Sequence, residues 1–397
     1  MSRVAVTGMG IVSSIGMSVD ENYQSLISKR NGITRVDNIQ TILRESIKVG
    51  EIKQTNEELS QRLGLDQDNN YSRTAILGEL AAIEAVNQSG GIDDPQKTGI
   101  ISSTSVAGMD KTEQHYYEIF EDDSLVKYAF CHPAGDSTNK IANRLGIKGF
   151  TSTISTACSS GANAIMLGAR MIKSGQLDQV VVGGTDCLSK FTMNGFNSLM
   201  ILSNNDCTPF DKDRKGLNLG EAAAYLVLES EESAKANNKE ILAYVVGYGN
   251  ANDAHHQTAS SENGDGATLA MEKALKVAQI QPEAIDYVNA HGTATENNDA
   301  SESKALLRIF GSQVPDFSST KAYTGHTLAA AGAIEAVYSI LAINNNQIFP
   351  NLNFKDPIED SGLVPVTEVK GKEINFVLSN SFGFGGNCSS VIFQKAK

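Results

Sequence analysis

Three short segments of the amino-acid sequence recur, in the same order, in its first and second halves. The pairs are 3–12 (RVAVTGMGIV) with 242–251 (LAYVVGYGNA), 156–165 (TACSSGANAI) with 324–334 (TGHTLAAAGAI), and 216–229 with 383–394. Strand-like and helix-like patterns alternate throughout, which predicts an α/β protein. Ordered repeats inside such a pattern predict a duplicated α/β unit.

The polar stretch 229–240 (ESEESAKANNKE) carries charge without an apolar stripe and is the best candidate boundary between the halves. We expect a first half over 1–235 and a second over 236–397. Helices are predicted over 72–88 and 160–172 and from about residue 301. Strands are predicted at 3–7, 99–103, 151–155, 179–182, 223–228, 241–246, 285–289, 374–378 and 390–394.

Composition excludes several functional classes. The 397 residues include 33 basic and 46 acidic side chains, a net charge of −13, which lacks the positive field that nonspecific nucleic-acid or anionic-membrane binding requires. Five cysteines without a CxxC pair indicate neither a disulfide framework nor a zinc site. No apolar run is long enough to span a membrane, and the N-terminus lacks a signal-peptide pattern, so we expect a cytoplasmic protein.

Cys158 lies where the β-branched segment 151–155 gives way to a helix rich in small residues. Helix N-termini favour a thiolate over a thiol, and the small neighbours allow a substrate to approach closely. The pattern therefore predicts a nucleophile that accepts an acyl group. The alternative is a small core cysteine.

Two further sequence segments carry titratable side chains in predicted turns. Residues 289–299 (NAHGTATENND) place His291 at the end of a strand beside two hydroxyls, although a capped turn before a helix would also explain Asp299. Residues 318–326 (SSTKAYTGH) contain Lys321 and His326. Such groups are costly to bury alone, and Glu335 is a plausible partner for Lys321.

The stretch 380–387 (NSFGFGGN) is a glycine-rich loop after a strand, whose amides could form an oxyanion hole. It lacks the Gly-Lys-Ser/Thr ending of a phosphate loop. Gly8-Met9-Gly10 also fails as a dinucleotide-binding fingerprint, because Ser13 occupies the position of the third glycine.

These four motifs, in this order, resemble the elongating β-ketoacyl-acyl-carrier-protein synthases of the thiolase superfamily, and 209–221 adds a further match. The resemblance covers essentially the whole chain. It implies a duplicated five-layer α-β-α-β-α fold and an acyltransferase that performs decarboxylative Claisen condensation. It also implies a dimer: a homodimer, or a heterodimer with a related subunit.

The resemblance implies a role for each motif. Cys158 would take the acyl group, with the amides of Cys158 and Phe384 as oxyanion hole and Phe384 as a gate. His291 and His326 would stabilise the enolate from malonyl-carrier protein, while Lys321, supported by Glu335, would keep them neutral. Thr293 and Thr295 would hold the phosphopantetheine arm of the acyl carrier protein. No bound cofactor and no metal are implied.

Departures from the family pattern keep alternatives open. The run 294–299 (ATENND) is closer to polyketide and aryl-polyene synthases, which work with a chain-length subunit. The chain could itself be a noncatalytic chain-length subunit, or a biosynthetic thiolase with Cys388 as second cysteine. Candidate carrier-docking residues are Arg62, Arg73, Lys212, Arg214 and Lys215, and candidate pocket residues are Val106, Ala107 and Met109.

Overall fold

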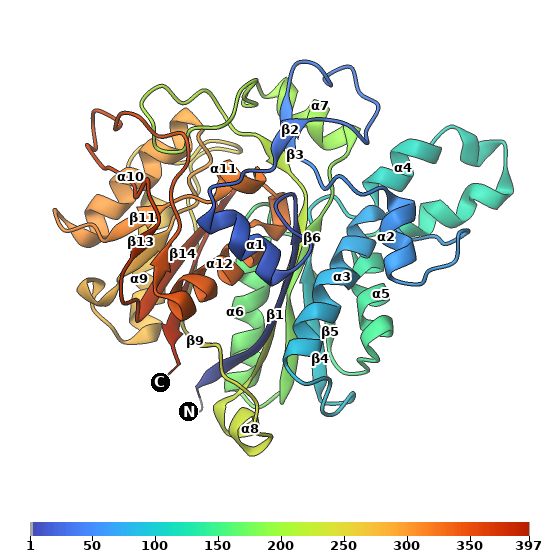
Figure 1. Cartoon of the computed structure of the whole chain (residues 1–397), viewed down its shortest axis with the longest axis horizontal. Coiled ribbons are helices and arrows are strands. Elements are labelled where there is room, and N and C mark those ends of the chain that lie inside the picture. The colour runs from blue at the N-terminus through green and yellow to red at the C-terminus, as the bar shows by residue number, and fades with distance from the viewer. Residues whose placement is uncertain (1–2, 397) are drawn as a thin grey trace.

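The computed structural model describes residues 3–396 and is built on one ten-stranded sheet with five strands from each half (Figure 1). In sheet order, the first half supplies β5 (Thr151–Ile154), β4 (Thr98–Ser103), β6 (Gln179–Asp186), β8 (Ala222–Ser230) and β1 (Val4–Ser13). The second half continues with β9 (Ala243–Asn252), β15 (Asn387–Lys395), β14 (Phe376–Gly383), β10 (Tyr287–Asn289) and β11 (Asp316–Ser318).

Strand pairing has the same pattern in the two halves. Counting from β1 outward, the first two pairings are antiparallel and the last two are parallel, and the same holds counting from β9. The halves meet where β1 pairs antiparallel with β9. The predicted duplication is therefore confirmed, and all three sequence repeats occupy equivalent places in the two halves.

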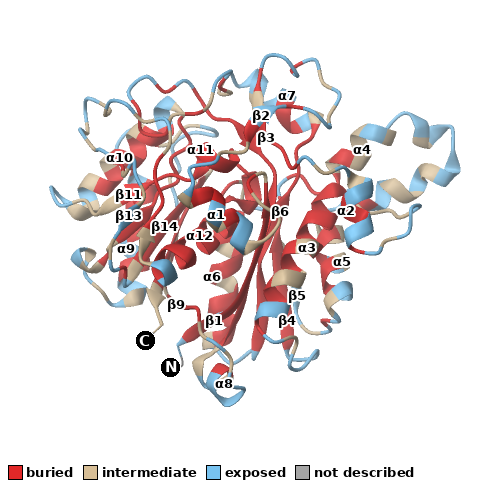
Figure 2. Cartoon of the chain, viewed as in Figure 1, coloured by how far each residue is buried: buried red, intermediate tan, exposed pale blue. Residues whose placement is uncertain are grey.

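Helices complete the layers. In the first half, α3 (Arg73–Gln88) packs on β1 and β8, and in the second half α9 (Asp265–Ala278) packs on β9 and β15. Between the halves, α6 (Ser160–Lys173) packs against α12 (Ala331–Asn345). Figure 2 shows the strands and these central helices as the buried interior, with exposed residues concentrated in the outer loops and helices.

Close backbone contacts explain two of the repeats. A Cβ on Gly10 of β1 would lie 2.1 Å from the carbonyl oxygen of Ala81, and a Cβ on Gly249 of β9 would lie 2.1 Å from that of Ala270. Each half therefore uses glycine to seat its outer helix directly on its first strand.

The central helices touch in the same reciprocal way. A Cβ on Gly161 would lie 2.7 Å from the backbone nitrogen of Ala333, and a Cβ on Gly332 would lie 2.7 Å from that of Ala162. Glycines that begin two equivalent helices let their backbones meet at the centre of the molecule.

Shorter elements surround this core. The remaining helices are α1 (Val19–Ile27), α2 (Asn56–Arg62), α4 (Met109–His115), α5 (Gly135–Leu145), α7 (Lys190–Ser198), α8 (Glu231–Ala236), α10 (Glu296–Phe310) and α11 (Lys321–Thr324), with 3₁₀ turns at Glu118–Phe120, Asp123–Cys131, Pro282–Ala284 and Leu328–Ala330. Two small sheets pair β2 (Ile33–Arg35), β3 (Lys48–Gly50) and β7 (Leu219–Gly220), and β12 (Gln347–Ile348) with β13 (Lys370–Gly371).

Some predicted boundaries are wrong. The helix expected from about residue 301 begins at Glu296, with Asp299 in its first turn, where the carboxylate accepts hydrogen bonds from the amides of Ala294 and Phe210. The polar stretch 229–240 lies between β8 of the first half and β9 of the second. Glu229 is fully buried near the end of β8 and pairs with Lys239, and α8 forms between them. The charged sequence did not reveal that Glu229 is buried, because its carboxylate is neutralised by Lys239, ten residues further along the chain.

One helical stretch, Leu328–Asn345, is long and apolar enough to qualify as a membrane span by composition. It is 89% buried inside the protein, where it forms the central helix layer.

Candidate active site

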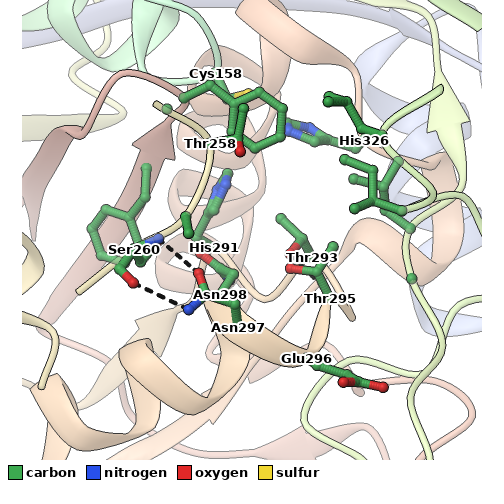
Figure 3. A pocket seen from close by; sticks show the side chains of 18 of the residues that line it. Cys158, Thr258, Ser260, His291, Thr293, Thr295, Glu296, Asn297, Asn298 and His326 are labelled. Carbon is green, nitrogen blue, oxygen red and sulfur yellow. Dashed lines mark hydrogen bonds between the residues drawn. The ribbon is translucent and has the colours of Figure 1, made fainter. Parts of the chain in front are cut away.

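A pocket of about 390 Å³ lies where loops of the two halves converge, and it gathers most of the residues that the motifs single out. Figure 3 shows Cys158 and His326 at one end, His291 beside them, and Glu296 at the other end. Among its lining residues are Cys158, His291, Thr293, Thr295, His326 and Phe384.

Cys158 lies two residues before the first residue of α6, after an elbow in which Ala157 takes a positive φ of 53°. The side chain is buried, and burial raises the pKa of its thiol to about 11, while Lys321 and the amides of Phe384 and Cys158 act in the opposite direction. Burial therefore outweighs the helix effect that the sequence predicts, and the resting group at neutral pH is a thiol.

The two histidines meet edge to face, with ring centroids 5.3 Å apart and planes at 84°. Both are buried, and burial, reinforced by the nearby Lys321, holds the pKa of each imidazole well below its usual value. Both rings are therefore neutral at physiological pH. Within residues 3–396, their buried Nδ1 atoms have no hydrogen-bond partner.

Lys321, at the first position of α11, does not line the pocket but lies behind it. Its Nζ donates to the carbonyl oxygen of His291 at 2.5 Å and to the carboxylate of Glu335 on α12. Both charged side chains are buried, so the predicted pairing of Lys321 with Glu335 is present. A fixed cation behind two imidazoles disfavours their protonation.

Glu302 on α10 is a site residue that the sequence analysis missed. Its carboxylate accepts hydrogen bonds from the amides of His291 (2.9 Å) and Gly292 (2.8 Å) and from the side chain of Asn380 (3.1 Å), so it joins two of the motifs. Burial raises its pKa to about 7, against these hydrogen bonds. The sequence did offer one indication of this role: Glu302 lies four positions before Leu306, on the same buried face of α10, where an acidic residue is unusual.

The far end of the pocket is polar. The hydroxyl oxygens of Thr293 and Thr295 are 2.9 Å apart, and the guanidinium of Arg214 donates to the carbonyl oxygens of Thr295 and Glu296. Two other lining residues are aromatic: Phe384 stacks on Phe196 of α7, with centroids 5.7 Å apart and planes at 19°. The pocket thus combines hydroxyl groups, a thiol and aromatic rings.

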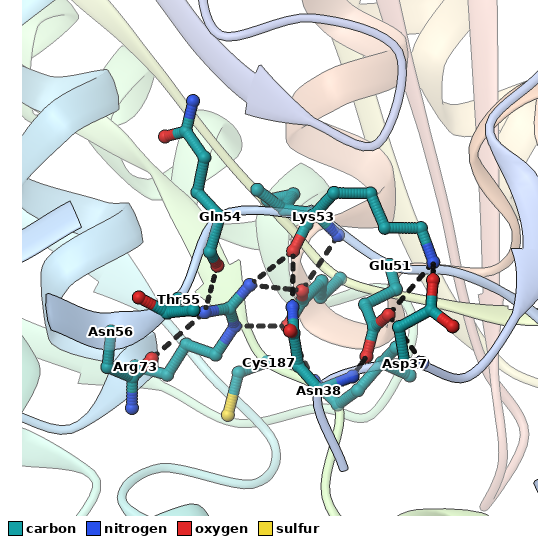
Figure 4. Close-up of polar contacts among 12 residues, drawn as sticks. Asp37, Asn38, Glu51, Lys53, Gln54, Thr55, Asn56, Arg73 and Cys187 are labelled. Carbon is teal, nitrogen blue, oxygen red and sulfur yellow. Dashed lines mark hydrogen bonds and ion pairs between the residues drawn. The ribbon is translucent and has the colours of Figure 1, made fainter. Parts of the chain in front are cut away.

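The structure overturns two of the predicted carrier-docking residues. Arg73 is buried and forms two hydrogen bonds with Glu221, of 2.8 and 2.7 Å, within the polar cluster of Figure 4. Arg214 is also buried, and its guanidinium makes the hydrogen bonds to Thr295 and Glu296 described above. Arg62, Lys212 and Lys215 are exposed, although Lys212 pairs with Asp356, and Lys215 lines the pocket mouth.

The predicted pocket residues Val106, Ala107 and Met109 do not line this pocket. Val106 instead belongs to a buried apolar cluster, and it is Phe196, Ile201 and Leu217 of this cluster and its neighbours that line the pocket. Among the five cysteines, all buried and unpaired by disulfides, Cys388 lines the pocket together with Cys158. Burial raises the pKa of the Cys388 thiol to about 12.

Comparison with family models matches the beta-ketoacyl synthase N-terminal domain over residues 1–234 and the beta-ketoacyl synthase C-terminal domain over residues 242–355. The chain belongs to the β-ketoacyl synthase family. The proteins named 3-oxoacyl-[acyl-carrier-protein] synthase 2 from Vibrio cholerae and Staphylococcus aureus are 35% and 32% identical to this β-ketoacyl synthase. Both alignments cover 99% of this chain, and 99% and 98% of those proteins.

Solved structures agree with this assignment. The ishigamide ketosynthase/chain length factor matches with a TM-score of 0.92 at 30% identity, over the full length of both chains. A ketosynthase from Xenorhabdus doucetiae, in complex with its chain length factor, matches with a TM-score of 0.85 at 31% identity, over 100% of this chain and 98% of that one. The predicted family, thiolase-like fold and acyltransferase class are confirmed.

Proposed function

We propose that this β-ketoacyl synthase performs decarboxylative Claisen condensation in two half-reactions. In the first, the Cys158 sulfur attacks the thioester of an acyl carrier protein, and the carrier leaves as a free thiol. In the second, malonyl-carrier protein loses carbon dioxide, and the resulting carbanion attacks the acyl-cysteine. A carbon–carbon bond forms as the carbon–sulfur bond to Cys158 breaks. The sulfur leaves as a thiolate that takes up a proton, and the β-ketoacyl product remains on the carrier protein. The presence of Cys158, His291 and His326 in one pocket is the observation that carries this proposal.

Neutral imidazoles suit the second half-reaction. His291 and His326 can each donate a hydrogen bond to the enolate oxygen that develops as carbon dioxide leaves, and one well-aimed donor contributes about 3 kcal/mol. A charged imidazolium would instead protonate the carbanion. The amides of Cys158 and Phe384 approach the sulfur and serve as the oxyanion hole for the tetrahedral intermediates.

The polar end of the pocket fits a substrate attached to the phosphopantetheine of an acyl carrier protein. Thr293 and Thr295 lie between the mouth and Cys158, where their hydroxyls can hydrogen-bond the amides of phosphopantetheine. Phe384, stacked on Phe196, is the candidate gate between the half-reactions. Support for a carrier partner comes from a ketosynthase solved with its acyl-carrier protein, which matches with a TM-score of 0.86 at 26% identity. The enzyme itself needs no bound cofactor.

We infer that the enzyme is a cytoplasmic dimer. β5 is one of the two edge strands of the ten-stranded sheet, and α5, which packs against it, also contacts the 3₁₀ turn Asp123–Cys131. The segment from α4 through this turn carries large exposed rings: Tyr116, Tyr117, Phe120 and Phe130. An open strand edge next to exposed aromatics is typical of an interface. A second copy of this chain is the first candidate for the partner.

A second candidate function is polyketide or aryl-polyene synthesis with a related chain-length subunit on that face. The match to the ishigamide ketosynthase/chain length factor, with its TM-score of 0.92, favours it. Sedimentation of the purified chain, alone and co-expressed with a neighbouring related gene product, separates homodimer from heterodimer. Acyl-chain profiling by mass spectrometry separates the pathways, because efficient turnover of saturated chains only would contradict the polyene assignment.

The direct test of condensation compares wild type with Cys158→Ala on acyl- and malonyl-carrier protein. Loss of β-ketoacyl product in the variant is expected, and equal condensation by both would sink the proposal. Failure of an acyl electrophile to label Cys158 would revive the noncatalytic-subunit alternative. Equal turnover of coenzyme A thioesters would favour the thiolase alternative, in which Cys388 is the second cysteine.

A further inference from the structure

The carboxylate of Asp186, at the end of β6, is fully buried and accepts hydrogen bonds from two separate segments of the chain. On one side lie residues 104–106, which follow β4. They contribute the Thr104 hydroxyl (2.5 Å), the Ser105 hydroxyl (2.5 Å) and amide (3.0 and 3.1 Å) and the Val106 amide (3.1 Å). On the other side, the amide of Ala329 donates at 2.9 Å.

Each segment leads to a part of the active site. Ala329 lies three residues after His326, and between them Leu328 is held at a positive φ of 53°. Residues 104–106 carry Val106, and the next residue, Ala107, also has a positive φ of 51°. Such backbone conformations persist only where surrounding contacts hold them, and Asp186 supplies contacts to both.

The two segments also meet each other. Val106 and Leu328 belong to the same buried apolar cluster, with Leu188 and Met193, and Phe196 packs against that cluster. Phe196 in turn faces the pocket and stacks on Phe384. One carboxylate thus fixes both sides of the apolar wall behind Phe196, and it also fixes the backbone that follows His326.

We propose that Asp186 is a positioning residue that sets the acyl-chain length accepted by Cys158 and the placement of His326. The inference rests on the proposed condensation, because the acyl group must extend from Cys158 along apolar side chains. With the wall held firmly, chains that fit are accepted and longer ones are rejected. Releasing the wall admits longer chains and misplaces the imidazole.

Asp186→Asn tests both effects. Three of the donors are backbone amides, which cannot reverse direction, so the new side-chain amide faces at least one of them with like polarity. We expect kcat for condensation to fall by roughly a hundredfold, because small displacements at a reacting centre have effects of this size. KM for malonyl-carrier protein stays within about twofold, since the binding hydroxyls are untouched. The preferred saturated acyl chain lengthens.

Two variants accompany it. Thr104→Val keeps the side-chain shape but removes one hydroxyl on the wall side, so the acyl-chain preference shifts while malonyl decarboxylation stays within about twofold of wild type.

Glu229→Gln is the matched control. Glu229 is an equally buried carboxylate on the neighbouring strand, opposite Gln179 at the far end of β6, and accepts from Thr7 and Lys239. It should change stability but no kinetic constant per active site, counted by stoichiometric labelling of Cys158.

The possible results distinguish failure of the Asp186 inference from failure of the proposed condensation. Unchanged kcat and chain preference in Asp186→Asn, or the same changes in Glu229→Gln, would overturn the inference. If Asp186→Asn does not fold, an unchanged acyl profile in Thr104→Val overturns it instead. Wild-type enzyme that fails to condense at all would refute the proposed function, whereas active wild type with indifferent variants refutes only the role of Asp186.

Discussion

The Nζ atom of Lys321 lies 2.5 Å from the carbonyl oxygen of His291, so a buried cation is bonded to the backbone of a residue whose ring must stay neutral. The same ammonium pairs with Glu335. Lysine here is thus an electrostatic and structural link between the two histidine segments.

Replacing Lys321 with Met should leave Glu335 as an unpaired buried carboxylate. We expect the free energy of unfolding to fall by about 3–5 kcal/mol in urea titrations at neutral pH. Adding Glu335→Gln removes the stranded charge and should restore most of that stability, but not the electrostatic effect on the imidazoles. A loss below about 1 kcal/mol in the single variant would show that the pair is solvated rather than buried.

The neutral histidines predict a pH dependence of stability. Their pKa values are lower in the folded protein than in the unfolded chain, so the unfolded state binds more protons as pH falls below about 6.5. Their contribution to the free energy of unfolding is fully present above about pH 6.5. It is lost as pH falls further, at about 1.4 kcal/mol per histidine per pH unit.

Glu302 and Glu335 have raised pKa values, to about 7, and act in the opposite sense, gaining stability as pH falls from about 7 toward about 4.5. The measurement therefore compares wild type with a His291→Asn, His326→Asn double variant by urea unfolding from neutral to mildly acidic pH. The variant should lose less stability on acidification. Parallel curves would mean that the imidazoles have the same pKa in the folded and unfolded states, so that burial does not lower it.

The raised pKa of Cys158 predicts slow alkylation at neutral pH. Because the thiolate reacts, the rate constant for iodoacetamide should rise about tenfold per pH unit and keep rising until pH approaches about 11. Mass spectrometry of the Cys158 peptide follows the reaction, and Cys158→Ser controls for labelling at Cys388. A plateau below pH 8 would identify a resting thiolate, as the helix position alone suggests.

Much of this architecture follows from sequence. The repeats predict the duplication because the same glycines are needed where each outer helix meets its strand, as at Gly10 and Gly249. The four motifs also predict which side chains share the pocket. What the sequence could not reveal depends on burial: the thiol state of Cys158 and the removal of Arg73 from the surface arise from desolvation and from partners distant in sequence.

Glu302 and Asp186 illustrate the same limit. Each is an acid within an ordinary helix or strand pattern, and only the folded chain brings the amides of other segments to its carboxylate. Periodicity assigns such a residue to a face, but it does not reveal the donors that the face will meet.

Lys215, exposed at the pocket mouth, should contribute to carrier docking. Lys215→Glu should raise KM for an acidic carrier protein by roughly tenfold at low salt, with little change in kcat, because a rim charge acts mainly on association. The effect should shrink as added salt screens the charges. Lys235→Glu on α8, outside the pocket, reverses the same charge as a control. Equal KM changes in both variants would indicate a global charge effect instead of a docking contact.

The contact between the central helices offers a final test of how the halves are joined. Gly161→Ala places a methyl group 2.7 Å from the backbone nitrogen of Ala333, and Gly332→Ala does the same against Ala162. Backbone atoms cannot turn aside, so α6 and α12 must separate. Each variant should lose about 1–3 kcal/mol of unfolding free energy, despite the gain of about 1 kcal/mol in helix propensity.

Gly195→Ala in α7 is the control, because among residues 3–396 no atom outside its own helix backbone and chain neighbours lies within 4 Å of its added Cβ. It should be neutral or stabilising by up to about 1 kcal/mol. Since Gly161 follows the nucleophile by three residues, its variant should also acylate more slowly, whereas Gly332→Ala reaches Cys158 only through the displaced helix. If all three alanine variants have the same free energy of unfolding in urea, the central helices can accommodate the added methyl groups. The reciprocal glycines then do not determine how the halves meet.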